Sequence, residues 1–227
     1  MRKGEVRRQA IVDAANALFC SKGYIETTVD DILAELNCSK GSFYHYFDSK
    51  LAVLQAICES RVQQSFEMYR QTRVTSTREK LDTLLYWAQP FRPENEDWLL
   101  VTLKLRQRGE GFVMDGAMRQ SLRAQFKPEM ENLLLILNET GAARISRPRV
   151  EDVVFEAFTA FCDEMNEAVL QCARQGRSVV TDVTQVAEAA RFLWERVLDI
   201  DYGSMELLRL DEALPMLERV AARLRQS

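Results

Sequence analysis

Histidine is almost missing from this chain, which holds a single one, His45, among 227 residues. A zinc site of the HExxH type needs two histidines, so that site is excluded. A serine or cysteine catalytic triad would have to use His45 as its base. The sequence also lacks the GxGxxG and GxxxxGKS/T motifs that hold nucleotide phosphates. We therefore expect no enzyme activity, no metal site and no cofactor.

Glycine and proline are scarce, at 9 and 5 residues, while leucine, alanine, glutamate, arginine and glutamine are plentiful. This composition favours an all-α protein. No apolar run approaches the roughly 18 residues that cross a bilayer. The first residues are charged but have no apolar segment behind them, which argues against a signal peptide. We expect a cytoplasmic protein with no membrane partner.

Cysteine occurs five times, without CxxC spacing. In a cytoplasmic protein this pattern predicts reduced thiols that pack as small apolar side chains. The positions are Cys20, Cys38, Cys58, Cys162 and Cys172. A disulfide switch across a two-fold axis is a minor alternative.

Charge is distributed unevenly, although the net charge is only −4. Residues 1–50 are neutral, with seven basic and seven acidic side chains, so the remainder carries the whole acidic excess. Four basic residues lie at the very start: Arg2, Lys3, Arg7 and Arg8. They form either an arm for a DNA phosphate or minor groove, or a solvated terminus. A neutral N-terminal segment predicts modest nonspecific affinity for DNA.

Residues 27–50 read as two short helices and the start of a third. Thr28 and Asp31 have the spacing of a capping box, and apolar residues follow at helical spacing. Asn37 is suited to end this helix in a left-handed conformation, and Ser39 is suited to cap the next. The turn is then three or four residues long, as in a helix-turn-helix.

The second helix, Lys40–Phe47, combines cationic, hydroxyl and aromatic groups and has no acid. Phe43 and Phe47 are four residues apart and can anchor one face. The other residues are Lys40, Gly41, Ser42, Tyr44, His45 and Tyr46. Hydroxyls, lysine and helix N-terminal N–H groups are common donors to phosphate, and Gly41 permits close approach of a backbone. The pattern indicates a face that binds double-stranded DNA.

These residues resemble the DNA-binding signature of the TetR family of one-component transcriptional regulators. The resemblance covers about residues 6–57. It rests on Phe19, Gly23, Tyr24, Thr27, Thr28, Val29, Ile32, Ser39, Lys40, Gly41, Ser42, Phe43, Tyr44, Tyr46, Phe47 and Lys50. Asn37 and Cys38 depart from it slightly.

The resemblance implies that Lys40, Ser42, Tyr44 and His45 face the major groove. It implies that Thr28, Tyr46 and Lys50 hold phosphates. Ser39 and Gly41 complete the predicted DNA-binding set. The implied fold has about nine or ten helices. Residues 1–50 would form a three-helix DNA-binding domain, and residues 51–227 a helical bundle that binds a ligand and dimerises.

A helix predicted over residues 150–175 has one face that suits a ligand site in the bundle. Phe155, Phe158 and Cys162 share an apolar stripe with Thr159 and Asn166. Because buried polar groups need partners, the last two would bond either a ligand or a neighbouring helix. The other ligand-binding candidates are Trp87, Trp98 and Met118, which are equally compatible with core packing. The few charges on these faces favour a largely apolar or aromatic effector.

A dimer seam is predicted on another face of the same helix, where small residues would let a second helix approach. The residues are Ala157, Ala160, Glu164 and Ala168, joined by Ala190 and Trp194 from the next helix. An intramolecular core is the alternative, and the family resemblance favours the homodimer.

The sequence thus predicts a homodimeric regulator, most simply a repressor, that a small effector releases from a near-palindromic operator. The alternative is a helix-turn-helix regulator without a small-molecule effector, which is constitutive or controlled by a protein partner. A cavity in the bundle would separate the two.

Overall fold

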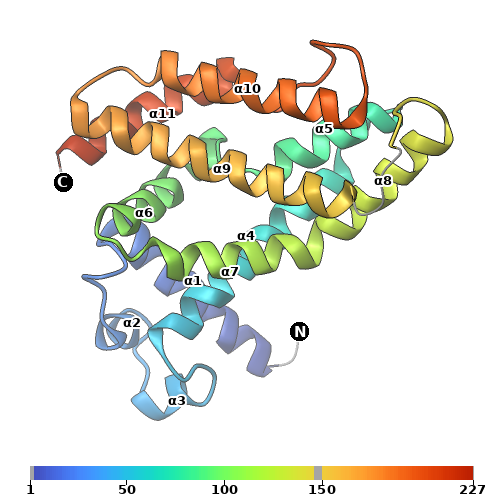
Figure 1. Ribbon diagram of the computed structural model, residues 1–227. Helices are drawn as coiled ribbons and strands as arrows, with labels where there is room; N and C mark the ends of the chain where they lie inside the picture. Colours follow the sequence, from blue (N-terminus) through green and yellow to red (C-terminus); the bar gives the residue numbers. More distant parts are fainter. Residues whose placement is uncertain (1–2, 146–149, 227) are drawn as a thin grey trace.

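The computed structural model describes residues 3–145 and 150–226, and every regular element in these ranges is helical (Figure 1). The all-α fold class is confirmed. The α-helices are α1 Lys3–Ser21, α2 Val29–Glu35, α3 Lys40–Tyr44, α4 Lys50–Gln71, α5 Thr77–Ala88, α6 Glu96–Gln107, α7 Gly111–Gln125, α8 Lys127–Glu139, α9 Val150–Gln175, α10 Val180–Leu198 and α11 Leu210–Arg225. A 3-10 turn, Pro93–Asn95, precedes α6. None of these described helices is long and apolar enough to cross a membrane.

Local signals set several of these boundaries. Ser76 caps α5 through a capping box with Glu79, as Thr28 and Asp31 do for α2. Pro128 lies in the first turn of α8, where it separates this helix from α7. The predicted bounds of α9 agree with the structure. Helix α3 is shorter than predicted, because it ends at Tyr44 rather than Phe47.

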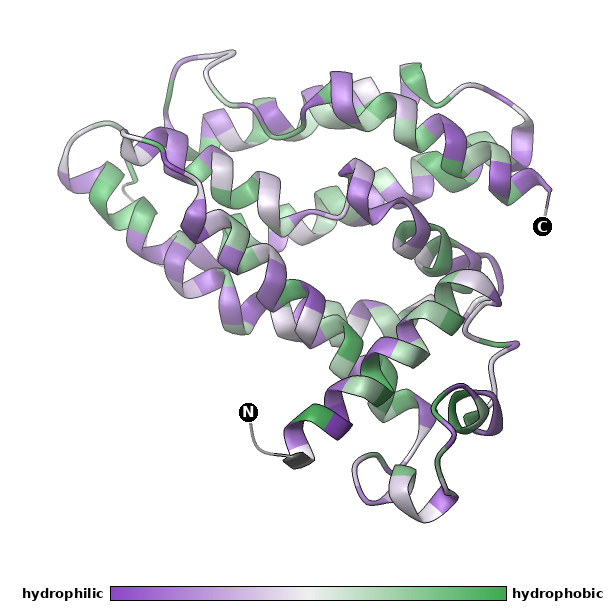
Figure 2. Ribbon diagram, turned by 180° about the vertical axis from the view of Figure 1, so that it is seen from behind, coloured by the Kyte–Doolittle hydropathy of each residue, from purple (hydrophilic) through white to green (hydrophobic). Residues whose placement is uncertain are grey.

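The three N-terminal helices form a head at one end of the molecule, and α9, α10 and α11 lie at the other (Figure 1). Helix α4 runs from the head into the bundle. Hydrophobic and hydrophilic residues alternate along the helices, as amphipathic helices require (Figure 2). Because α4 is one continuous helix, it holds the head to the bundle.

Two hydrophobic clusters fill the protein, and they divide within α4. The first joins α1, α2 and α3 to α4 as far as Cys58, and it also takes Trp98, Val101 and Leu105 of α6 and Met114 of α7. The second contains the rest of the bundle, beginning with Val62. The head therefore packs directly on α6 and α7.

Candidate DNA-binding head and effector cavity

The turn between α2 and α3 has the geometry of a helix-turn-helix. The Thr28 backbone N–H donates to Asp31 Oδ2 at 2.7 Å, and Thr28 Oγ1 accepts from the Asp31 N–H at 3.1 Å. Asn37 has φ 46°, the left-handed value expected at a helix C-terminus. Ser39 Oγ then accepts from the Ser42 N–H at 3.3 Å. These contacts confirm the predicted caps and fix α3 relative to α2.

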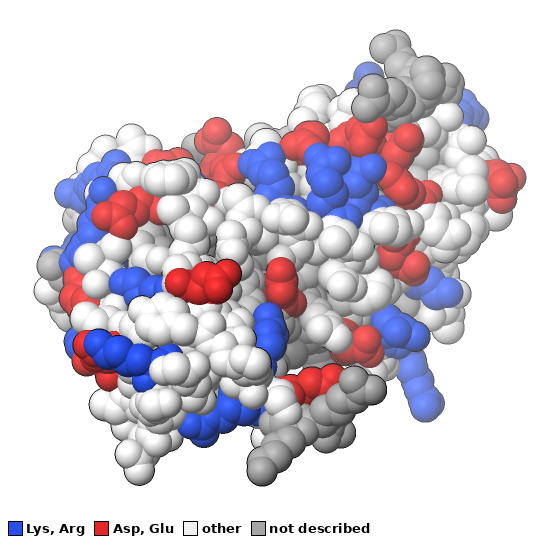
Figure 3. Space-filling view, turned by 90° about the horizontal axis from the view of Figure 1, so that it is seen from below, with Lys and Arg blue, Asp and Glu red and all other residues white. Residues whose placement is uncertain are grey.

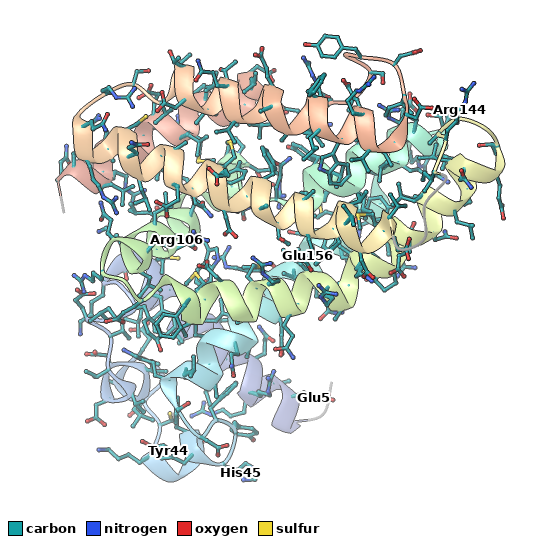
Figure 4. The ribbon with its side chains drawn as sticks, in the orientation of Figure 1. Glu5, Tyr44, His45, Arg106, Arg144 and Glu156 are labelled. Atoms are coloured by element: carbon teal, nitrogen blue, oxygen red, sulfur yellow. The ribbon has the colours of Figure 1, made fainter. Side chains whose placement is uncertain are left out.

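Helix α3 presents its polar and aromatic side chains outward. Phe43 and Phe47 are buried, and they anchor the helix as predicted. Tyr44 is 52% exposed and His45 is exposed, and both lie at the tip of the head (Figure 4). Tyr46 is half-buried against the head, with its ring edge-on to His45 at 4.7 Å between centroids.

Acidic side chains compensate the basic groups of the head. Lys40 lies 3.1 Å from Asp30, and Lys22 lies 2.6 Å from Asp31. Figure 3 views the end of the molecule that carries α2 and α3, where lysine and arginine atoms are scattered among acidic ones. Exposed ion pairs of this kind are weak, so Lys40 can exchange Asp30 for a phosphate or a base at little cost.

Lys50 lies in the first turn of α4, as predicted, and its side chain reaches the loop between α1 and α2. Its Nζ donates to the carbonyl oxygens of Tyr24 at 2.7 Å, Thr27 at 2.9 Å and Ile25 at 3.4 Å. It also lies 4.2 Å from the centroid of the Tyr24 ring. Burial lowers the pKa of this ammonium group. Because the three carbonyls use all its donors, Lys50 clamps the loop between α1 and α2 in this structure. Its contact with a phosphate stays a prediction.

The structure describes part of the predicted N-terminal arm. Arg8 lies over the Phe47 ring, with its guanidinium carbon 4.9 Å from the centroid. Arg2 lies outside the described residues.

A cavity of about 100 Å³ lies in the bundle between α4, α6, α7 and α9. Five of the predicted ligand-binding residues line it: Trp98, Met118, Thr159, Cys162 and Asn166. Residues far apart in the sequence thus meet at one site, next to the helices that support the head.

Three other ligand-binding candidates lie elsewhere. Phe155 and Phe158 are almost fully buried and belong to the bundle core, beside a separate void of only about 10 Å³. Trp87 donates from Nε1 to Thr72 Oγ1 at 3.2 Å, and Arg92 stacks on its ring. Phe155 and Phe158 pack the bundle, because the stripe predicted on α9 is wide enough to face both the core and the cavity. Trp87 of α5 also packs against the bundle core.

The cavity wall is more charged than predicted. Arg106 lies 2.8 Å from Asp115 and 2.6 Å from Asp163, and Arg119 lies 3.1 Å from Asp163. Glu156 extends this network at the side of α9 (Figure 4). These residues are absent from the predicted ligand-binding set, as is Arg61, which also lines the cavity. A signal existed for Arg61, since it follows Ile57 and Cys58 at helical spacing on the buried side of α4.

The five cysteines are free thiols. Burial raises the pKa of Cys58 to about 12, and burial also raises the pKa of Cys162. Both thiols are therefore protonated at neutral pH and poorly nucleophilic.

The predicted dimer residues divide into three groups by exposure. Trp194 is 2% exposed and Ala168 is 8% exposed within a single chain, so both already belong to its core. Ala157 and Ala190 are half-buried against the same core. Ala160 and Glu164 are exposed on α9, and two large side chains, Phe192 and Leu193, are about half exposed on α10. Because their own chain already buries them, Trp194 and Ala168 are not available for the predicted dimer seam.

The geometry defines a helix-turn-helix unit that one long helix joins to an all-α bundle with a cavity. The family model for bacterial regulatory proteins of the tetR family matches residues 11–57. The match covers α2, α3 and parts of α1 and α4, and it leaves the rest of the bundle outside.

Relatives share the same segment. The HTH-type transcriptional regulator SrpR of Pseudomonas putida is 39% identical over 59 residues, 26% of this chain and 28% of its own. The negative transcriptional regulator IcaR of the biofilm operon icaADBC in Staphylococcus aureus is 44% identical over 48 residues, 21% of this chain and 26% of its own. The matched segment thus spans little more than a quarter of either relative.

Solved structures resemble the chain over most of its length. The FadR repressor of Thermus thermophilus, in complex with lauroyl-CoA, has a TM-score of 0.52 at 22% identity, covering 81% of this chain and 92% of its own. RolR, in complex with resorcinol, has a TM-score of 0.53 at 16% identity, covering 98% and 96%. At these identities the likeness concerns the fold alone.

Proposed function

We propose that the protein is a homodimeric transcription regulator, a repressor, that binds double-stranded DNA through α3 and leaves it when a small molecule binds the bundle. The observation that carries this proposal is the capped turn that holds α3 with Tyr44 and His45 outward at the tip of the head. The tetR-family match covers the same residues.

At the DNA, Lys40, Ser42, Tyr44 and His45 would contact base edges in the major groove. Thr28 and Tyr46, together with the backbone at Ser39 and Gly41, would position the phosphates. Because the head is nearly neutral, a single head would bind weakly. We therefore propose that residues 1–50 of two chains read half-sites about 34–36 Å apart. DNA as the partner would place the protein in the cytoplasm.

The second copy would pack on the outer face of α9 and α10, which lie side by side (Figure 1). Ala160 and Glu164 of α9 and Phe192 and Leu193 of α10 are exposed there, and exposed apolar residues that lie together mark interaction surfaces. Residues 51–227 would thus supply both the seam and the effector site.

The cavity supports an effector rather than control by a protein partner alone. An effector releases DNA only if it binds the DNA-free arrangement of the heads more tightly than the DNA-bound one. FadR and RolR, which share the fold, carry lauroyl-CoA and resorcinol in their structures.

Fluorescence anisotropy tests the function. The purified full-length protein is titrated into labelled DNA that flanks its own gene, at two salt concentrations, with unrelated DNA as the control. We expect tight binding to the flanking DNA alone. The proposal is contradicted if the protein binds unrelated DNA as tightly as every promoter fragment of the neighbouring genes. This result counts only for protein from which denaturation releases no small molecule.

A further inference from the structure

Unpaired polar groups gather around the cavity. Five lining side chains carry a buried nitrogen or oxygen without a hydrogen-bond partner among the described residues. These atoms are Arg61 Nε, Gln89 Oε1, Trp98 Nε1, Arg106 Nε and Asn166 Oδ1. Buried polar atoms are normally paired, and only three further cases occur in the described part of the chain. Their concentration here points to a polar ligand rather than to an apolar one.

Most of these unpaired atoms are donors, and two of them lie together. The Arg61 guanidinium stacks on the Trp98 indole, with its central carbon 4.3 Å from the ring centroid. Arg61 and Trp98 therefore form one end of the cavity wall, and the N–H groups of Arg61 Nε and Trp98 Nε1 both lack an acceptor. Asn166 and Gln89 offer acceptor oxygens elsewhere in the wall.

Charge at that end is also uncompensated. Arg106 and Arg119 are neutralised by Asp115 and Asp163. Arg61, in contrast, has no carboxylate within ion-pair distance among the described residues, and its Nη2 donates to the amide oxygen of Asn16 at 2.9 Å. Burial lowers the pKa of Arg61, because a buried cation lacks the solvation of water. An anion beside it would offset that cost.

The rest of the wall limits the size and the body of the ligand. Val62, Met114, Met118 and Leu122 supply apolar side chains. A volume of about 100 Å³ is smaller than the roughly 150 Å³ cavity that encloses one benzene ring in an engineered protein, but this pocket is only half enclosed, so a ring can enter with one edge in solvent. A compact body with one charged group fits these limits.

Building on the proposed regulator function, we propose that the effector is a small monocarboxylate, of the size of an arylcarboxylate such as benzoate. Its carboxylate accepts from Arg61 and Trp98, and its apolar body lies against Met114, Met118 and Leu122. The predicted preference for a largely apolar effector is thereby narrowed to an apolar body with one anionic group.

This site would connect the ligand with the head. Arg61 bonds Asn16, which belongs to α1, while Trp98 and Met114 belong both to the cavity wall and to the hydrophobic cluster of the head. A carboxylate that draws the guanidinium toward the cavity competes with Asn16 for it. Loss of the hydrogen bond to Asn16 would weaken the packing of α1, the helix that precedes α2 and α3.

Isothermal titration calorimetry with the full-length protein tests the ligand class. Benzoate is compared with benzamide, which has the same shape and no charge. We expect benzoate to bind at least ten-fold more tightly. Arg61→Met should weaken benzoate at least ten-fold and change benzamide less than two-fold. Arg123→Met, which removes an arginine of α7 outside the cavity, is the matched control and should leave both affinities unchanged.

Two further variants protect the test against misfolding. Arg61→Lys keeps the charge but lacks the Nε donor, and Trp98→Phe keeps a ring but lacks the indole N–H; each should weaken benzoate while thermal melting stays cooperative. Benzamide binding as tightly as benzoate, or benzoate affinity indifferent to Arg61, overturns the proposal. So does the failure of both benzoate and hexanoate to bind at ten millimolar.

Failure of the ligand class and failure of the regulator function are distinguishable. If carboxylates fail but DNA anisotropy shows specific binding, only the ligand class is wrong. If benzoate binds through Arg61 but no DNA is recognised, the carboxylate site stands and the regulator function falls.

Discussion

Replacing Lys50 with methionine separates two roles for this residue, a loop clamp and a phosphate contact. The substitution keeps the length of the side chain but removes the donors that hold the carbonyls of Tyr24 and Thr27. Hydrogen bonds to a charged group contribute about 1.5–3 kcal/mol each. Because Lys50 is half-buried, solvent screening reduces the sum, and we expect a loss of about 2–3 kcal/mol.

The loss corresponds to a fall in melting temperature of roughly 4–12 °C for a chain of this size. Thermal unfolding followed by circular dichroism measures it. Lys40→Met is the matched control, since Lys40 lies in the same head and its only described partner is the exposed Asp30. We expect Lys40→Met to change the melting temperature by less than about 2 °C.

DNA binding should distinguish the two lysines in the opposite sense. If Lys40 contacts DNA, its loss weakens binding and lowers the salt slope by about one per head. Under conditions where the Lys50→Met protein is folded, its salt slope should match that of the parent chain. A normal melting temperature with a salt slope reduced by one per head would refute the clamp and restore the phosphate contact.

Three other substitutions test the head, the seam and the bundle. Tyr44→Ala should abolish specific DNA binding in anisotropy without changing the melting temperature, because the side chain is exposed; retained binding would contradict the docking through α3. Leu193→Glu should shift the protein from dimer to monomer in sedimentation velocity, whereas an unchanged profile removes α10 from the seam. Burial raises the pKa of Asp82 to about 6 despite Arg78, so the folded state binds its proton more tightly. Stability should therefore fall by on the order of 2 kcal/mol from pH 4 to pH 7, and Asp82→Asn should remove that part of the pH dependence in urea titrations.

Local chemistry explains which parts of the head could be predicted. The cap of α2 depends on Thr28 and Asp31, three residues apart, and the end of α2 depends on the tolerance of Asn37 for positive φ. Both effects act within one turn of helix, so the sequence alone contains them. The family resemblance added the orientation of α3, which spacing does not supply.

Contacts between distant segments could not be predicted in the same way. The donors of Lys50 meet carbonyls 23 to 26 residues earlier in the chain. No periodicity of α4 indicates which carbonyls face it, and the predicted phosphate contact came from the family resemblance. A lysine at a helix start is compatible with both roles until the loop is in place.

Helical periodicity identifies a buried face but does not say what covers it. Trp194 lies on the apolar side of α10, and the same pattern would follow whether a second chain or the same chain covered it. The structure covers it with its own bundle and leaves its sequence neighbours Phe192 and Leu193 outside. A dimer seam is better sought among side chains that one folded chain leaves exposed.

The arrangement of the cavity limits how an effector can act on DNA. Trp98 and Met114 line the cavity on one side and complete the hydrophobic cluster of the head on the other. Close-packed side chains transmit small displacements, because there is no empty space to absorb them. A ligand that repacks these two residues must therefore either strain the head cluster or move α1. Only the second outcome changes the distance between two heads in a dimer, and it requires no contact between the ligand and α3.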